Sequence, residues 1–232
     1  MRRSALANLT RIAASQLPLA LAVLTTLTMA GCGVVGRTSV KTVQLAIQGK
    51  PDVQPTAAQV AAKPYPQIKV TGPSGGAVLV LGNVDGERRA WYSADRSIVY
   101  LTDGLVVGTY RGQPELQGMR IEGDSPFRAL HQIADGTTVR RRYDVMPGYR
   151  FGIEVTGTLN TLGRESVEIL GQSRELLHVR ERLRGSSGWR RNNDYWVDPS
   201  NGFIWKSVQA IAPDTSLEII QLKPYSQDLK DQ

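Results

Sequence analysis

From Gln67 onward, apolar and polar residues alternate along the chain in short runs. A period of two is typical of β-strands that bury one face. The clearest run places four apolar residues on the same face: Phe151, Ile153, Val155 and Leu159. We expect that face to be buried and the opposite face, which includes Glu154, to be in contact with water.

Turn signals rich in Gly, Pro, Asn and Asp separate these runs. They include Gly72-Pro73-Ser74-Gly75-Gly76, Asp103-Gly104, Asp135-Gly136, Pro147-Gly148, Gly163 and Asn201-Gly202. The predicted strands span residues 67–71, 77–83, 87–93, 96–102, 104–110, 137–145, 149–160, 164–171, 174–184, 189–198, 202–211 and 215–222. Short turns join antiparallel neighbours, because parallel pairing needs long crossovers. The pattern therefore predicts an all-β fold, a large antiparallel meander that curls into a barrel or half-barrel or splits into a sandwich.

Two short helices interrupt this pattern. Thr56 to Gln59 has the form of a capping box before an alanine-rich turn. Pro64 and Pro66 then end the helix, because proline cannot donate to a helical ladder. We expect the second helix at Ser125–Ile133, where Ser125 and Pro126 are suited to the cap and the first turn.

The N-terminal segment has a different pattern. Leu17–Ala30 is a short apolar run, and Arg2, Arg3 and Arg11 precede it, with no acidic residue before Asp52. The run is shorter than the roughly 20 residues that span a bilayer. This layout predicts a signal segment.

Cys32 is the only cysteine of the chain and directly follows Ala30-Gly31. Small residues before a lone cysteine predict a bacterial lipoprotein signal, in which the thiol is acylated and the peptide is cut before it. Met29 departs from the Leu, Val or Ile usual three residues before the cysteine. Gly33, where an Asp would resemble an inner-membrane retention signal, favours the outer membrane. The alternative is an ordinary signal peptide followed by a buried cysteine.

These features divide the chain into four parts. We expect a lipoprotein signal peptide at 1–31, a lipid-anchored tether with a short helix at 32–64, a single β domain at 65–225 and a polar tail at 226–232. Loss of the three arginines in the signal lowers the net charge from +7 to +4. A mildly basic chain with a secreted address and no nucleic-acid motif excludes DNA as a partner.

We find no catalytic or metal-binding pattern. Gly72 to Gly76 fits G-x-S-x-G, but a strand follows it, so a hairpin turn is the better interpretation. His131 and His178 are far apart and have no ligand at metal-binding spacing. Four carboxylates alternate with basic residues and are expected to form solvated cross-strand pairs: Glu165, Glu168, Glu175 and Glu181. The sequence predicts neither an enzyme, a metal site nor a cofactor.

Aromatic residues are the remaining candidates for a binding site. Indole rings are common platforms for sugar rings, and five aromatic residues are candidates for glycan or partner contact: Trp91, Tyr92, Trp189, Trp196 and Trp205. Packing in the core is the alternative that we favour. Within Arg140–Arg142, Arg141 shares a face with Val139 and Tyr143. The three arginines are expected to form a solvated face, with a strip for anionic polysaccharide as the alternative.

Several stretches resemble one known family. They are Trp189 to Gly202 (WRRNNDYWVDPSNG), Lys206-Ser207, Leu222-Lys223-Pro224, Lys63-Pro64-Tyr65 and Trp91 to Asp95 (WYSAD). These stretches, in their order and spacing along the chain, resemble the YjbF/GfcB lipoproteins of group 4 capsule and exopolysaccharide operons. The resemblance covers about residues 40–225. Met29 and Lys63 depart from the family pattern.

The resemblance implies a non-catalytic outer-membrane lipoprotein that faces the periplasm and helps to assemble or export polysaccharide. It implies polysaccharide or an outer-membrane β-barrel export protein as the partner, in addition to the membrane held through Cys32. It supplies no catalytic residues. An alternative from the curled sheet itself is a periplasmic carrier for lipid or lipoprotein acyl chains.

Overall fold

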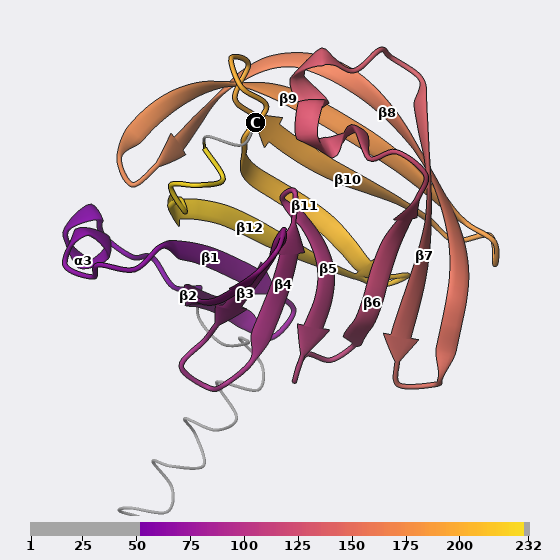
Figure 1. Cartoon of the computed structure of the whole chain (residues 1–232), viewed down its shortest axis with the longest axis horizontal. Helices are drawn as coiled ribbons and strands as arrows, with labels where there is room; N and C mark the ends of the chain where they lie inside the picture. Colours follow the sequence, from indigo (N-terminus) through magenta and orange to yellow (C-terminus); the bar gives the residue numbers. More distant parts are fainter. Residues whose placement is uncertain (1–51, 230–232) are drawn as a thin grey trace, which may run out of the picture. The chain divides into compact units, whose positions relative to one another are not determined.

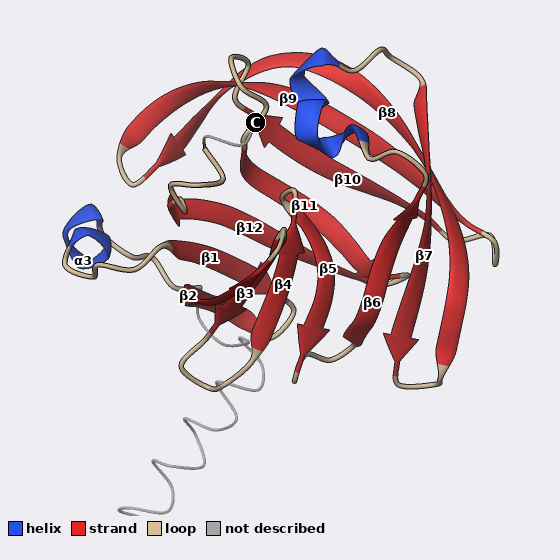
Figure 2. Ribbon diagram, viewed as in Figure 1, coloured by secondary structure: helices blue, strands red, loops and turns tan. Residues whose placement is uncertain are grey.

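The computed structural model describes residues 52–229, which lie within one compact unit (Figure 1). The predicted signal peptide, Cys32 and most of the predicted tether lie outside the described residues. Strands dominate the fold, as Figure 2 shows, and the all-β prediction is confirmed.

The unit contains twelve strands and two short helices within the described range. The strands are β1 (Gln67–Gly72), β2 (Gly75–Asp85), β3 (Arg88–Tyr92), β4 (Ile98–Thr102), β5 (Leu105–Tyr110), β6 (Glu115–Glu122), β7 (Thr137–Met146), β8 (Arg150–Ile169), β9 (Gln172–Gly185), β10 (Arg190–Val197), β11 (Ile204–Ala212) and β12 (Thr215–Lys223). The helices are α3 (Ala57–Ala61) and the 3-10 helix η1 (Pro126–Gln132).

All twelve strands form one antiparallel sheet in the order β5-β4-β3-β2-β1-β12-β11-β10-β9-β8-β7-β6. Every pair in this order consists of chain neighbours except β1 and β12, which join the two halves of the meander. The sheet curls into a nearly closed barrel (Figure 1), so the sandwich alternative is wrong.

The edges of the sheet, β5 and β6, meet without a strand ladder between them. Side chains connect them at one end of the seam. The Leu116 amide donates to Thr109 Oγ1 at 2.9 Å, and the Arg111 amide donates to Glu115 Oε2 at 3.1 Å. Toward the start of β5 the two strands diverge (Figure 1).

The two predicted helices are present. The capping box of α3 is confirmed, because Thr56 Oγ1 accepts from the Gln59 amide and the Gln59 side chain accepts from the Thr56 amide. Helix η1 begins with Pro126 as predicted and buries Phe127 and Leu130. The Ser125 side chain forms no capping bond, so that part of the prediction is wrong.

Two strand predictions are wrong for physical reasons. β8 continues through Gly163, where we expected a turn, because Gly163 forms a bulge opposite β9 with φ of 122°. β6 was not predicted at all. A bulge between Leu116 and Gly118 puts Leu116 and Met119, three residues apart, among the buried residues and interrupts the period of two.

The core fills the concave side of the sheet. Val155 and Leu159 are buried there as predicted, whereas Phe151 is 59% exposed beside Gly152, whose φ is 65°. The predicted alternation of Arg141 with its neighbours is confirmed, but its solvated setting is wrong, because Arg141 is 1% exposed. The prediction that Glu181 forms a solvated pair is wrong for the same reason, because Glu181 is completely buried and pairs with Arg141.

Candidate functional site

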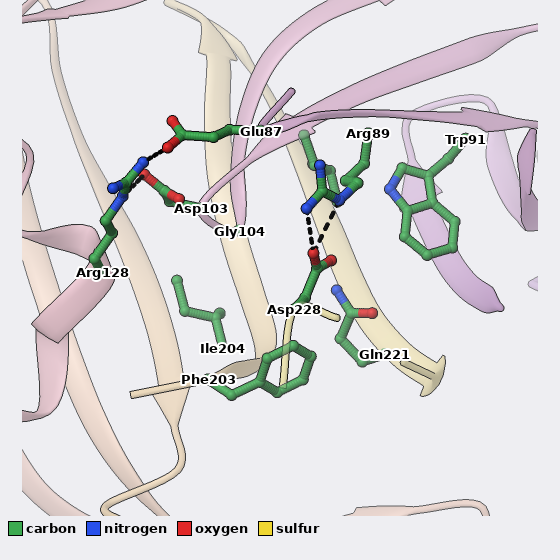
Figure 3. A pocket seen from close by; sticks show the side chains of 11 residues that line it. Glu87, Arg89, Trp91, Asp103, Gly104, Arg128, Phe203, Ile204, Gln221 and Asp228 are labelled. Carbon is green, nitrogen blue, oxygen red and sulfur yellow. Dashed lines mark hydrogen bonds and ion pairs between the residues drawn. The ribbon is translucent and has the colours of Figure 1, made fainter. Parts of the chain in front are cut away.

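A cavity of about 250 Å³ lies where the β4–β5 turn, helix η1 and the C-terminal segment meet. Its lining comes from distant parts of the chain: Glu87, Arg89, Trp91, Leu101, Asp103, Gly104, Arg128, Phe203, Ile204, Gln221 and Asp228. Figure 3 shows these side chains converging on one space. The lining combines an apolar wall with charged and amide groups.

Asp103 and Gly104 form the β4–β5 turn, as the sequence predicted. Both residues have positive φ, 49° and 75°, which suits a two-residue hairpin connection. A side chain at Gly104 would also collide with Ile204, since a Cβ there would lie 2.7 Å from its Cδ1 atom. The glycine therefore lets the turn close one side of the cavity.

Two ion pairs frame the cavity (Figure 3). Arg89 binds Asp228 through Nη2 at 2.6 Å and through Nε at 2.9 Å. Arg128, from η1, contacts Glu87 and donates from Nε to Asp103 Oδ2 at 3.2 Å. The lining therefore has three carboxylates and two guanidinium groups, and each guanidinium is already neutralised.

The environment of Asp103 is the most perturbed part of the cavity. Burial raises the pKa of its carboxyl above the usual range, and the neighbouring Asp228 acts in the same direction. The Arg89 guanidinium opposes this by favouring the ionised form. The carboxyl group is thus poorly solvated, and its Oδ2 accepts the hydrogen bond from Arg128 at the edge of the cavity.

Trp91 reaches the cavity from β3 and is 1% exposed. Its Nε1–H group is buried and has no hydrogen-bond partner among the described residues. In Figure 3 the nitrogen side of the indole ring is turned toward Arg89. A buried donor without a partner is costly, so this atom is suited to a ligand oxygen.

The five predicted aromatic residues are not brought together in one platform. Trp91 lies in the cavity and within the main core. Tyr92, the next residue along β3, packs over Gly82 and is 37% exposed. Trp189 packs against Gly185, and its Nε1–H group is also buried without a partner in the described range.

Trp196 and Trp205 belong to a second apolar cluster, with Ile169, Leu176 and Phe203. Arg174 stacks over the Trp205 ring at 3.8 Å, and Lys206 Nζ lies 4.9 Å from the centre of the Trp196 ring. Both rings are therefore covered on one face by a cation. Contact of the five aromatic residues with glycan remains a prediction.

His178 is the centre of a polar group beside the second cluster. Its Nδ1 lies 2.6 Å from Glu165 Oε1, and its Nε2 lies 2.8 Å from Asp194 Oδ1. The imidazole stacks on Trp196 with 4.6 Å between ring centres, and Trp196 Nε1 donates to Glu165 at 2.8 Å. His178 is buried, and both of its ring nitrogens are bound. The group ties β8, β9 and β10 together.

Within residues 52–229, no group of His, Cys, Asp and Glu side chains is arranged to hold a metal ion. The described residues also include no helix that is both long and apolar enough to cross a membrane.

Sequence reasoning missed most of the cavity. Of its lining, only Trp91 was a candidate, and Asp103-Gly104 was predicted only as a turn. Gln221 had a usable signal, because it shares a strand face with the buried Ile219 and is polar where an apolar residue is expected. Asp228 lies in the predicted tail and had no such signal.

Together, the curled antiparallel sheet and its recessed polar cavity define a β-barrel-like domain. A family model described as group 4 capsule polysaccharide lipoprotein gfcB, YjbF, matches residues 40–222. The chain belongs to this family, as its motifs had indicated.

Two comparisons agree with this assignment. The chain is 24% identical over 203 residues to an uncharacterized lipoprotein, GfcB, of Escherichia coli K12, and the match covers 84% of this chain and 94% of that protein. It is also similar to the crystal structure of the hypothetical lipoprotein YmcC from the same strain, with a TM-score of 0.68 and 24% identity. That match covers 80% of this chain and 96% of the solved one. The structural likeness supports the fold.

Proposed function

We propose that this protein is an outer-membrane lipoprotein, anchored through acylated Cys32 and facing the periplasm, that assists the assembly or export of a polysaccharide without catalysing a reaction. Its partner in this role is the polysaccharide or an outer-membrane β-barrel export protein. The supporting observation is the match to a capsule polysaccharide lipoprotein family over residues 40–222, which includes nearly all of the described strands.

The start of the described chain is compatible with an anchored domain. Asp52 is tied to β1 by Lys69 Nζ at 2.6 Å and by the Thr71 hydroxyl at 3.2 Å. The Lys69 hydrogen bond lowers the pKa of Asp52, so this contact is present at neutral pH. The 20 residues from Cys32 to Asp52 can span at most about 70 Å. A lipid at Cys32 would therefore keep the sheet within that distance of the membrane surface.

Deletion of the gene tests the proposal. We expect a deletion strain to carry less polysaccharide at its surface and to retain polysaccharide in the periplasm. Expression of the full chain from a plasmid should restore the surface level. Unchanged surface polysaccharide in the deletion strain would contradict the proposed function.

A second candidate function is a carrier for acyl chains. It is favoured by a cavity of about 750 Å³ beside the diverging edges of β5 and β6, whose lining includes Leu105, Val107, Met119 and Ile121. Charged residues, including Arg120 and Asp124, share that lining. Titration of the full-length protein with fatty acids of increasing length distinguishes the candidates. Saturable binding that strengthens with each added CH₂ would favour the carrier.

A further inference from the structure

We propose that the cavity around Trp91 binds a single neutral sugar residue at the end of a glycan chain. This inference rests on the proposed function and adds to it a site and a class of ligand. The cavity of about 250 Å³ has room for about eight water molecules at liquid density. It is smaller than the roughly 300–1,000 Å³ of pockets for drug-sized ligands, so one pyranose ring fits it better than an oligosaccharide.

The first argument is the unsatisfied donor. Trp91 Nε1–H is buried, has no partner within residues 52–229, and lies on the side of the ring turned toward Arg89 (Figure 3). Indole can only donate, so the matching ligand atom is an acceptor, such as a hydroxyl or ring oxygen. A ligand oxygen that reaches this enclosed atom would satisfy the donor.

The second argument is the mixture of polar groups around that donor. Gln221 is 7% exposed and offers both an acceptor and a donor through its carboxamide. Asp103 and Asp228 offer carboxylate acceptors that are held in place by arginines. Sugar hydroxyls both donate and accept, and so can use all of these groups. Leu101, Phe203 and Ile204 supply the apolar wall that the C–H groups of a sugar ring need.

The same lining argues against other small ligands. Three carboxylates against two paired guanidinium groups leave the cavity negative, which disfavours phosphate or a fatty-acid carboxylate. Its size and polar rim also leave no room for a long acyl chain. A neutral polyol is the class that fits both the charge and the hydrogen-bonding groups.

The C-terminal segment closes the site. Asp228 pairs with Arg89, and the same guanidinium lies 5.3 Å from the centre of the Tyr225 ring. Because this segment follows β12, it can be displaced without breaking the strand ladder. We therefore expect the sugar to enter beside Asp228.

Titration calorimetry on the full-length lipoprotein in detergent tests the site. The ligands are neutral monosaccharides and short fragments of the strain's own polysaccharide. Binding of at least one of them should weaken about fivefold or more in Trp91→Phe, which removes the free N–H, and in Gln221→Leu. Trp189→Phe is the matched control, because its buried Nε1–H is also unpaired among described residues but lies outside the cavity lining. Its binding should equal that of the unchanged protein.

The proposal is overturned if no sugar binds, if both cavity variants bind as well as Trp189→Phe, or if phosphate or laurate binds in preference to sugar. Thermal unfolding of each variant confirms that it is folded before titration. The outcome is separable from the proposed function. If the unchanged protein binds no sugar but gene deletion still reduces export, only the site is refuted. If the unchanged protein binds sugar but gene deletion leaves export unchanged, only the proposed function is refuted.

Discussion

Arg141 on β7 and Glu181 on β9 form an ion pair inside the barrel, on either side of β8, where Gly157 makes room for the carboxylate. A Cβ at Gly157 would overlap the Glu181 carboxylate. The pair is shared with Asn193 and Tyr195, which donate to Glu181 Oε2 at 3.1 and 3.0 Å. This network links side chains of β7, β9 and β10 over Gly157 of β8, so it connects four adjacent strands.

The space above Gly157 predicts the effect of one methyl group. Gly157→Ala should lower the free energy of unfolding by about 1–3 kcal/mol, because the new Cβ displaces Glu181 from its partners. Gly118→Ala in β6 is the control, since the nearest atom to its Cβ would be Asp144 Oδ2 at an ordinary 3.7 Å. Urea denaturation measures both variants. Equal stability of the two would contradict the packing described for the ion pair.

The pair itself predicts strong coupling. Burial opposes the charge of Arg141, but Glu181, with Tyr143 and Tyr195, raises the arginine pKa above its usual range, so the charge remains. Glu181→Gln should therefore cost about 3–5 kcal/mol by leaving that charge unpaired. The double variant Arg141→Met with Glu181→Leu should lose much less free energy of unfolding than the sum of the losses in Arg141→Met alone and Glu181→Leu alone. Additive free energies of unfolding would argue against a direct pair.

Gln209 predicts a local effect on β5. Its side chain accepts from the Val106 amide at 3.0 Å and donates to the Gly104 carbonyl at 2.8 Å, so it takes the place of a neighbouring strand. Gln209→Leu should cost about 1–3 kcal/mol through these unpaired buried groups. Hydrogen exchange at the Val106 amide should become faster, while Gln117→Leu, at an exposed position of β6, should leave it unchanged. Slow exchange at Val106 in both variants would refute this role.

Glu165 predicts a pH dependence of stability. Hydrogen bonds from Trp196 and His178 lower its pKa below the usual value of 4.5. A lowered folded-state pKa contributes stability above the unfolded pKa, and that contribution is lost as the pH falls through the folded value. Glu165→Gln should therefore be less stable than the unchanged protein at pH 7, and the difference should shrink below about pH 4.5.

Thermal unfolding between pH 3 and pH 7 measures this difference. The control is Glu168→Gln, an exposed carboxylate on the same strand. A gap between Glu165→Gln and the unchanged protein that stays constant across this range would show that Glu165 does not titrate differently in the folded state.

The period of two located most strands because one face of each strand is buried. It failed where the backbone departs from regular pleating. At β6 the bulge beside Gly118 breaks the alternation, and at Gly163 a glycine that reads as a turn forms a bulge in a long strand. The local hydrophobic pattern has no information on such insertions, because they are defined by the partner strand.

The cavity and the interior ion pair were beyond a local reading for a similar reason. Arg141 and Glu181 are 40 residues apart in sequence. They meet because β7 and β9 both pair with β8, and the two side chains reach each other across it. Arg89 and Asp228 are 139 residues apart and meet because β1 pairs with β12. The sequence could place Trp91 on a strand and identify its family motif, but the closure of the sheet decides which polar residues surround it.

Complementation with Cys32→Ser tests the central claim most directly, by measuring surface polysaccharide in the deletion strain. We predict that the unchanged chain restores surface polysaccharide and that Cys32→Ser, which cannot be acylated on sulfur, leaves it at the level of the deletion strain even when the variant is made in equal amount. Full restoration by Cys32→Ser would contradict the account of a membrane-anchored accessory in polysaccharide export.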